Sequence, residues 1–383
     1  MAPWEYTVAE LLSDAEYATA LYGKWHLGDR QGRLPNDQGF DEWWGIMNSW
    51  DEAGFTAWSL FKESGTPVPM IWEGKKGQPS RPVMPLDLKV RPIVDGDYII
   101  PKTVEHIKRN AAAKKPFFVY VGYSDVHPPV IGHRDLVGKS TQRGGLFADI
   151  IGEMDYRVGQ ILDAVKEAGI DDSTIVILRS DNASGGFVPQ VGHGSNGPWR
   201  GDFPNTPFEG SMRVPAIMRW PGNVPAGVVT NEMLASVDWL PTLAGMVGAS
   251  RLVPKDRPID GVDASAFMLG RSHTTGRDSY MFFGIDGELM SIKWKLYKTI
   301  FRYTESHAID KPYIRPQFPM VYDLSSDPHE DSNLFETDLT NGWILAPDFK
   351  LIGEYERSLK EYPNIKVGEE FRAIRSELRN RHD

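Results

Sequence analysis

Five polar side chains in this sequence have residue types and spacings that could hold a small anion together with a divalent cation. Lys24 and His26 lie two residues apart in LYGKWHLGD, so on an extended segment they would project to the same side and could bind one anion. His127 lies in SDVHPP, and Asp181 and Asn182 lie in RSDN. Aspartate and asparagine oxygens suit Ca²⁺ or Mg²⁺, whereas a nearby histidine can protonate a leaving group. The alternative interpretation of Lys24 and His26 is a strand end with two solvated side chains.

Three apolar segments would position these residues, because each segment ends where a polar loop begins. Residues 17–22, 117–121 and 174–178 are expected to be strands, and the second has the continuous apolar run of a buried parallel strand. Ligands of open α/β sheets bind outside the carboxyl ends of the strands. The five side chains are therefore expected to converge, which would place a divalent metal and cationic side chains around a tetrahedral anion ester.

Helices alternate with these strands, which favours an α/β fold with a mainly parallel sheet. Thr7 and Glu10 in TVAE form a capping box, which predicts the start of a helix. Three further helices and one further strand are predicted at residues 103–114, 146–168 and 238–247 and at residues 215–220. Residues 30–100 are rich in Pro, Gly and Trp and are expected to form long ordered loops, a common place for substrate contacts.

The sequence changes in character after Gly261. Short alternating segments between residues 279 and 301, and MVYD at residues 320–323, predict a small antiparallel sheet. A helical tail is expected from about Phe349. The chain is therefore predicted to form an α/β domain over residues 1–262 and a C-terminal antiparallel subdomain with its helix over residues 263–383.

The bulk composition excludes several kinds of partner and site. The 383 residues carry a net charge of −10, which argues against nucleic acid or an anionic membrane as the main partner. The sequence has no cysteine, which excludes disulfides, thiolate zinc sites and a cysteine nucleophile. Its first residues lack the features of a signal peptide and no apolar run is long enough for a membrane span. A cytoplasmic location is expected, or a periplasmic one if a leader precedes the sequence.

Eight segments in order carry a resemblance to a known family. They are YATALYGKWHLGD, GRLPNDQGFDEWWGI, SDVHPPV, ILRSDN, GPWRGDFPNTPFEGSMRVPAIMRWPG, VDWLPTLAGMVGA, IDGVDASAFMLG and VYDLSSDPHEDSNLF. Together they resemble the sulfatases, specifically the bacterial arylsulfatases of the alkaline phosphatase superfamily. This resemblance implies an alkaline-phosphatase-like α/β/α sandwich and the hydrolysis of small-molecule sulfate esters.

The resemblance also implies roles for the five residues. Lys24 and His26 match the family lysine and histidine that contact the sulfate and the nucleophile. His127 matches the histidine that binds a sulfate oxygen and can assist the leaving group. Asp181 and Asn182 match the second pair of ligands of the family Ca²⁺, for which Mg²⁺ is a possible substitute.

The sequence departs from the family pattern at three points. The family carries a first strand with two metal-binding aspartates, and a C/S-x-P/A-x-R motif whose cysteine or serine becomes formylglycine; neither has a counterpart here, and no formylglycine can arise from a cysteine. A family lysine is also missing in RGDFPNTPFEGS, where Arg200 is the nearest cation. A guanidinium can clamp an oxyanion with two hydrogen bonds, so Arg200 is a candidate substrate ligand; the alternative is a structural arginine.

The missing first strand has a structural consequence. Its neighbours in the sheet would keep unpaired edges, which invite association, or they would close up on each other. The expectation is therefore either a homo-oligomer formed through the vacated edge or a closed-up sheet.

Three functional interpretations remain open. The first is an arylsulfatase-like hydrolase without formylglycine, in which a water on the metal at Asp181 and Asn182 attacks while His26 or His127 acts as general acid. The second is a truncated or degenerate sulfatase that binds sulfate or phosphate without turnover. The third is a phosphoester hydrolase of the same superfamily, which lacks support from GKWHLGD.

Overall fold

The computed structural model describes residues 1–185, 194–204, 206–304 and 311–365. Its central sheet has the strand order β4–β3–β2–β1–β5. The middle strand β1 (Ala18–Lys24) pairs in parallel with β2 (Glu42–Ile46) on one side and with β5 (Phe117–Gly122) on the other. Two antiparallel strands, β3 (Met70–Lys75) and β4 (Arg81–Pro85), extend the sheet beyond β2. The parallel core β5–β1–β2 is the part that positions the candidate site.

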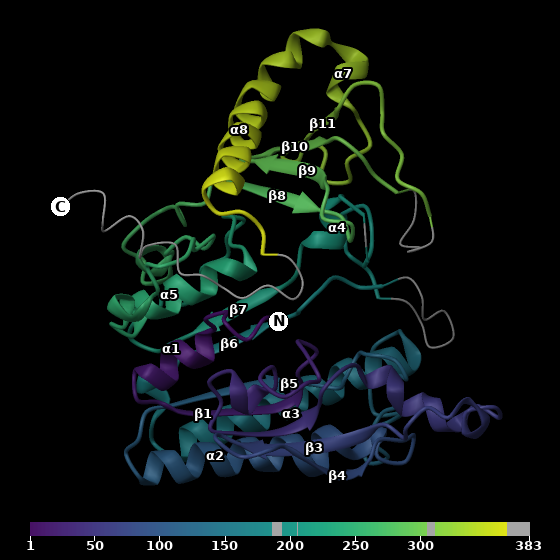
Figure 1. The fold of residues 1–383 in the computed structure, drawn as a ribbon, viewed down its shortest axis with the longest axis vertical. Helices are drawn as coiled ribbons and strands as arrows, with labels where there is room; N and C mark the ends of the chain where they lie inside the picture. The colour runs from purple at the N-terminus through teal and green to yellow at the C-terminus, as the bar shows by residue number, and fades with distance from the viewer. Residues whose placement is uncertain (186–193, 205, 305–310, 366–383) are drawn as a thin grey trace.

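Helices cover both faces of this sheet (Figure 1). On one face α1 (Val8–Asp14) packs between the sheet and α5 (Trp239–Met246), and on the other α2 (Ile100–Ala112) packs between the sheet and α3 (Gly145–Glu167). Each face has its own apolar core, because neighbouring residues of a strand point to opposite faces. Trp43 packs with Ala9 on the first face and Trp44 packs with Ile99 on the second. The α/β/α sandwich predicted from the sequence is confirmed.

The predicted capping box fixes the start of α1. The Glu10 backbone N–H donates to the Thr7 hydroxyl over 3.1 Å, and the Thr7 N–H donates to the Glu10 carboxylate over 2.8 Å. These two bonds satisfy backbone donors that have no partner within the helix. The helix therefore begins where the sequence predicted, directly before the central strand β1.

The prediction of long loops over residues 30–100 is wrong in part. This region contains β2, β3 and β4, together with 3-10 segments such as Trp50–Ala57 and Lys62–Ser64. The sequence concealed β2 because its two adjacent tryptophans are both buried, one on each face, so the strand has no alternation of apolar and polar residues. The residues that follow β2 consequently belong to the same edge of the sheet as those that follow β1 and β5.

The strands β6 (Val176–Arg179) and β7 (Ala216–Arg219) form a separate antiparallel pair. In the described part of the chain no backbone pairing joins β6 to β5, so the expectation of a closed-up sheet is wrong. The ends of the two strands are nevertheless neighbours: burial raises the pKa of Tyr120 on β5, and the charges of Arg179 and Asp181 also act on it. Tyr120 remains 48% exposed, and association through these edges stays a prediction.

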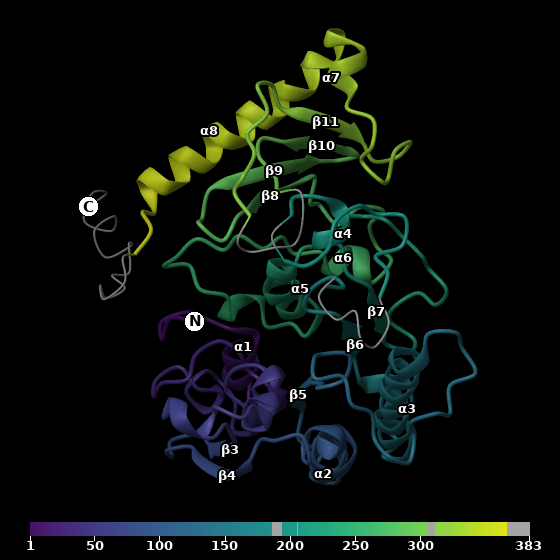
Figure 2. The same ribbon diagram turned by 90° about the vertical axis from the view of Figure 1, so that its right-hand side faces the viewer.

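The C-terminal region forms an antiparallel sheet in the order β11–β10–β9–β8, as predicted. Figure 2 shows α8 (Leu345–Glu361) running along this sheet, with α7 (Leu334–Thr337) at its end. The strands are β8 (Ser279–Phe283), β9 (Leu289–Trp294), β10 (Tyr297–Ile300) and β11 (Met320–Asp323). Glu209, on α4 (Glu209–Met212), is buried and accepts from Lys293 over 2.6 Å and from Lys298 over 3.0 Å, which ties the sheet to the α/β region. The domain boundary at residue 262 stays a prediction.

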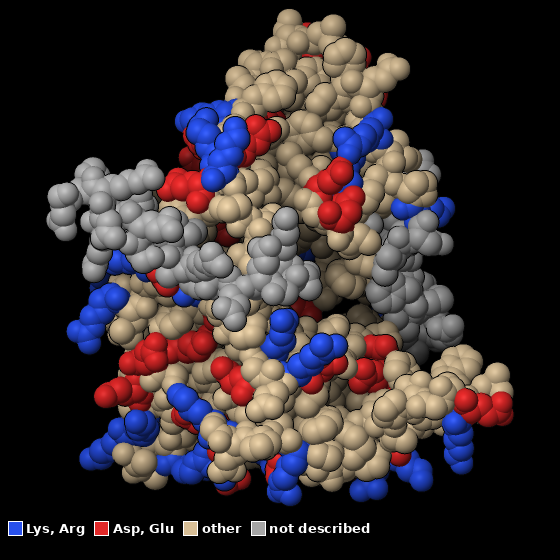
Figure 3. All heavy atoms as spheres, viewed as in Figure 1, with Lys and Arg blue, Asp and Glu red and all other residues tan. Residues whose placement is uncertain are grey.

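No helix among the described residues is long and apolar enough to cross a membrane. On the face shown in Figure 3, basic and acidic side chains are interspersed. The expected locations and the expected lack of nucleic-acid and membrane partners stay predictions.

Candidate active site

Lys24 and His26 lie at the carboxyl end of β1, as predicted. The extended backbone does not continue through His26, which has a left-handed conformation with φ 56°. The Lys24 ammonium still acts on His26: burial, and then this charge, lower the pKa of His26. Asp51 and Asp181 oppose this shift, so the charges of one cation and two carboxylates act on His26. The argument from an extended segment therefore fails at His26, and the binding of one anion by Lys24 and His26 together stays a prediction.

A glycine determines how closely the strands approach next to Lys24. Gly23 has φ +117°, and a Cβ atom there would lie 1.9 Å from the backbone oxygen of Gly122 on β5. Only a residue without a side chain fits between these two strand ends. The end of β1 is therefore held directly against the end of β5, from which the loop with His127 departs.

His127 is half-buried in this loop, and both of its ring nitrogens have partners. Its Nδ1 lies 2.7 Å from the Pro128 carbonyl oxygen, and its Nε2 lies 3.2 Å from the Ser49 hydroxyl. Burial lowers the pKa of His127, and the charges of Lys24 and Arg91 lower it further. The Pro128 hydrogen bond and the charge of Asp51 act in the opposite direction. The net shift favours a neutral imidazole at pH 7.

A buried arginine holds the backbone of the His127 loop. Arg91 is 1% exposed and donates to the His127 carbonyl oxygen over 2.8 Å and to the hydroxyl and carbonyl of Ser124. Asp95 in turn accepts from the Ser124 N–H over 3.0 Å and from its hydroxyl. Buried charges require such partners, because an unpaired ion is costly in a low-dielectric interior. Charge-assisted hydrogen bonds therefore hold the backbone of this loop on its buried side.

A second carboxyl group, that of Asp125, belongs to the same buried cluster. Burial, together with the nearby charges of Asp95 and Glu153, raises the pKa of Asp125 to about 9. Asp125 is accordingly protonated at neutral pH. This neutral form allows two carboxyl groups to lie close together behind the loop without mutual repulsion.

Asp181 and Asn182 follow β6, and the charge of Asp181 reaches His26. Asp181 is exposed, and its Oδ1 accepts the Asn182 N–H over 2.9 Å. Ca²⁺ takes six to eight oxygen ligands, and these residues offer two side chains. No cluster of three or more His, Cys, Asp or Glu residues suited to a metal occurs within the described ranges. The residues described do not complete a calcium site, so we derive no catalytic step through a metal.

Arg200 lies apart from this group. Its guanidinium carbon is 4.0 Å from the centroid of the Phe208 ring, and its Nη1 donates to the Glu330 carbonyl oxygen over 3.1 Å. These contacts fix Arg200 where the C-terminal sheet meets the α/β region. They favour the structural role over the predicted role as a substrate ligand.

Sequence reasoning missed three residues that the structure adds to the site: Ser49, Asp51 and Arg91. Ser49 and Asp51 follow β2, a strand in the region for which the sequence predicts loops. The rule that ligands gather at the carboxyl ends of strands would have found them had β2 been recognised. Arg91 follows the end of β4 at Pro85 by a few residues, and no local signal marks it as a site residue.

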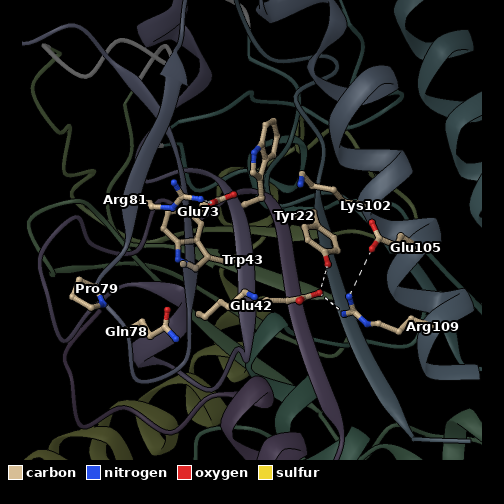
Figure 4. A pocket seen from close by; sticks show the side chains of 13 residues that line it. Tyr22, Glu42, Trp43, Glu73, Gln78, Pro79, Arg81, Lys102, Glu105 and Arg109 are labelled. Carbon is tan, nitrogen blue, oxygen red and sulfur yellow. Dashed lines mark hydrogen bonds and ion pairs between the residues drawn. The ribbon is translucent and has the colours of Figure 1, made fainter. Parts of the chain in front are cut away.

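A cavity of about 480 Å³ lies elsewhere, at the amino end of β2. Figure 4 shows Glu42 between Tyr22 and Arg109, to which it is joined by hydrogen bonds of 2.6 Å each. A hydrogen bond from His106 lowers the pKa of Glu42 further than burial raises it. The carboxylate is therefore already paired with its neighbours, and none of the predicted site residues lines this cavity.

Comparisons with known proteins show the family of this chain. The profile of the sulfatase family matches residues 2–249. The chain belongs to the sulfatase family. A second profile, described as N-sulphoglucosamine sulphohydrolase, C-terminal, matches residues 205–344. The match of the first profile covers Lys24, His26, His127, Asp181 and Asn182, but the roles of these residues stay predictions.

Individual relatives extend the comparison. N-acetylgalactosamine-6-sulfatase of Canis lupus familiaris is 34% identical over 299 residues, which are 78% of this chain and 54% of that protein. Arylsulfatase G of Rattus norvegicus is 30% identical over 358 residues, which cover 86% of this chain and 67% of that protein. The PsFucS1 sulfatase from Pseudoalteromonas sp. has a similar structure, with a TM-score of 0.85, 25% identity, and coverage of 95% of this chain and 75% of that one. The sulfatase chain spans about half the length of the first of these relatives.

Proposed function

We propose that this sulfatase chain hydrolyses small-molecule sulfate esters and that Lys24, His26 and His127 carry the reaction. The observation that supports this most strongly is electrostatic: the Lys24 ammonium acts on both histidines, which come from the ends of two adjacent parallel strands. One cation between two imidazoles suits a sulfate group with several oxygens. Family membership supports the same reaction class.

The chain's own groups suggest a division of labour. Lys24 would bind the sulfate oxygens throughout, because it is the cation that both histidines share. His127 is neutral near pH 7, so it would take up a proton from the hydroxyl that attacks sulfur and then give that proton to the leaving alcohol oxygen. His26 would stabilise the ester from the other side of Lys24. Each step uses groups that the fold already holds in place, which lowers the cost of assembling the transition state.

The test is hydrolysis of 4-nitrophenyl sulfate by the full chain, with and without added Ca²⁺, compared with His127→Ala. We expect the variant to lose about 10²- to 10⁴-fold in rate, the range for removal of a general acid or base. His329→Ala is the matched control, because His329 is an exposed histidine of the C-terminal region. Turnover that His127→Ala leaves unchanged would contradict the proposed site. A galactosamine 6-sulfate assayed in parallel tests the substrate suggested by the name of the canine relative.

A second candidate is binding of sulfate without turnover. The observation that favours it is that the described residues include no cluster of three or more His, Cys, Asp or Glu side chains that could hold a metal ion. Calorimetric titration with inorganic sulfate distinguishes the two functions: binding that Lys24→Ala removes, without ester hydrolysis, would support the binding function. Faster hydrolysis of 4-nitrophenyl phosphate than of the sulfate would instead support the phosphoester alternative.

The proposal also includes a bound divalent cation and self-association of the chain. Asp181 and Asn182 would contribute two ligands to a Ca²⁺ or Mg²⁺ ion, whose charge would help to hold an anionic ester. The unpaired edges of β5 and β6 would favour a homo-oligomer, because free backbone groups pair readily with another chain.

A further inference from the structure

Glu330 is a buried carboxyl group at the place where the C-terminal sheet meets the α/β region. It lies in the connection that follows β11 and is 0% exposed. Its Oε2 accepts the Glu209 backbone N–H over 2.7 Å, whereas its Oε1 has no hydrogen-bond partner among the described residues. A buried carboxylate is costly unless it is paired, so one bond from a backbone N–H leaves most of that cost uncompensated.

The cations near Glu330 bond other groups. The Lys298 ammonium on β10, which is also 0% exposed, donates to the Glu209 carboxylate over 3.0 Å. Lys293 on β9 donates to the same carboxylate over 2.6 Å. The Arg200 guanidinium donates over 3.1 Å to the backbone oxygen of Glu330 and not to its carboxyl group. Two lysines therefore neutralise Glu209, and within the described ranges no cation forms an ion pair with the Glu330 carboxyl group.

The backbone of Glu330 has an uncommon conformation as well. Its φ is 60°, in the left-handed region that residues other than glycine rarely adopt. Such conformations persist only where the surrounding structure holds them, and they cluster at ligand clamps and switch regions. Here the bond from Arg200 holds the backbone oxygen, and the bond from the Glu209 N–H holds the carboxyl group. The strain supports a role for Glu330 beyond filling space.

The charges around Glu330 agree with this geometry. The titratable and charged groups that act on it or that it acts on, from the elements packed against it, are Lys298, Arg200, Glu209 and Tyr322. Burial, together with the charge of Glu209, raises the pKa of Glu330 to about 7, against the two cations and the Glu209 N–H. Glu330 therefore keeps its proton in mildly acidic solution and loses it above neutral pH.

The segment that carries Arg200 continues towards the candidate active site. Three residues after Arg200, the Phe203 N–H donates to the Ser184 carbonyl oxygen over 3.1 Å. Ser184 follows Asn182 by two residues. A movement at Glu330 would therefore be transmitted through Arg200 and this backbone bond to the residues that follow Asn182.

We propose that Arg200, Glu209 and Glu330 form a proton-dependent latch between the C-terminal sheet and the α/β region. The latch is closed while Glu330 is protonated and opens when the proton passes to water. The carboxylate so formed is hydrated once its contact with Glu209 opens, which relieves the cost of burying an unpaired charge. The backbone segment around Phe203 loosens together with the latch. The proposal goes beyond the proposed function, because no step of it involves a sulfate ester.

The Glu209 backbone N–H reports the state of the latch, because Glu330 accepts its hydrogen bond. Hydrogen exchange of the full chain is followed by amide-resolved mass spectrometry at pH 6 and pH 8.5, and is corrected for the intrinsic effect of pH on exchange. A carboxyl group whose pKa is 4.5 when the latch is open and about 7 when it is closed changes the opening equilibrium by about tenfold between these pH values. We expect a rise of that size at Glu209 and a smaller one at Phe203.

One amide and two variants serve as references. The Val321 N–H in the same sheet donates to the uncharged Asn333 side chain over 3.0 Å, so its corrected exchange should change far less than that of Glu209. Glu330→Gln keeps the group uncharged at both pH values and should remove the rise at Glu209. Glu356→Gln, at an exposed glutamate of α8, is the matched control and should retain the rise.

Each other outcome contradicts a stated part of the proposal. Equal corrected exchange of Glu209 at the two pH values would overturn the latch, and so would a rise that persists in Glu330→Gln. A rise of the same size at Val321 would indicate a general opening of the sheet and would also overturn it. This comparison of two amides in the original chain decides the question even if Glu330→Gln does not fold. A rise at Glu209 with unchanged exchange at Phe203 would contradict the link to the residues after Asn182.

Discussion

The two halves of the candidate site differ in how firmly the fold holds them. His127 lies on a loop whose backbone is bonded by the buried Arg91, which is in turn paired with Ser124 and faced by Asp95. Asp181 follows a strand of a two-stranded sheet, is exposed, and bonds the backbone of its own neighbour. The anion-binding half is therefore organised before a ligand arrives, whereas the cation-binding half would have to be organised by its ligand. Binding energy is lost whenever groups must be ordered on binding.

Replacing Arg91 with methionine should have the largest effect on stability, because Arg91 holds the loop that carries His127. The change removes the guanidinium, which leaves the Ser124 and His127 carbonyl oxygens without this buried donor and the charge of Asp95 without the cation that faces it. We expect a loss of about 3–5 kcal/mol in the free energy of unfolding, the range for breaking a buried ion pair. Urea unfolding measures it, and Arg179→Met, at an exposed arginine at the end of β6, should cost about 0.5 kcal/mol or less. Similar losses in both variants would contradict the comparison.

Asp125→Asn should change how stability depends on pH. The pKa of Asp125 in the folded chain is about 9, above the value of 3.8 expected when unfolded, so between these values the folded state binds more protons. Its contribution is complete at low pH and is lost as the pH rises towards 9. We therefore expect the variant to lose less stability than the original chain between about pH 6 and pH 9, as measured by urea midpoints. Parallel pH curves for the two chains would be inconsistent with a buried protonated carboxyl group.

Asp181→Ala tests the loosely held half. Because Asp181 is exposed and supports little structure, we expect a change in unfolding free energy within about 0.5 kcal/mol. Ca²⁺ affinity, measured by calorimetry, should be weak in the original chain, with a Kd of about 10⁻⁴–10⁻³ M, and undetectable in the variant. Asp172→Ala, on the connection before β6, serves as the control. Tight calcium binding that survives Asp181→Ala would place the ion elsewhere.

Tyr120→Lys gives the smallest expected change, because it affects association alone. Tyr120 is half-exposed on β5, next to the unpaired edge. A lysine on an edge strand discourages pairing with another chain. Sedimentation velocity should show concentration-dependent dimers that the variant lacks and that Tyr156→Lys, at an exposed tyrosine of α3, retains. A chain that stays monomeric at every concentration would refute the association.

Much of the site could be predicted because it depends on where strands end. Lys24, His26 and His127 follow apolar runs, and the parallel pairing of β1 with β5 makes the loops that hold them leave the same edge of the sheet. Ser49 could not be placed because its strand is buried on both faces and too short to show a period. The role of Arg91 depends on contacts with a loop that lies far from it in sequence, and such contacts leave no local pattern. Arg200 likewise contacts Phe208 and Glu330 only in the folded chain, so the sequence could not predict these contacts.

The close contact at Gly23 has a consequence for how this site can vary. Any side chain there would push β5 away from β1, and with β5 would go the loop that carries His127. The distance between Lys24 and His127 therefore depends on the spacing between β1 and β5. New substrates could be accommodated by changing the loops that surround the ester, but the spacing of these two groups could change only if the strands separated.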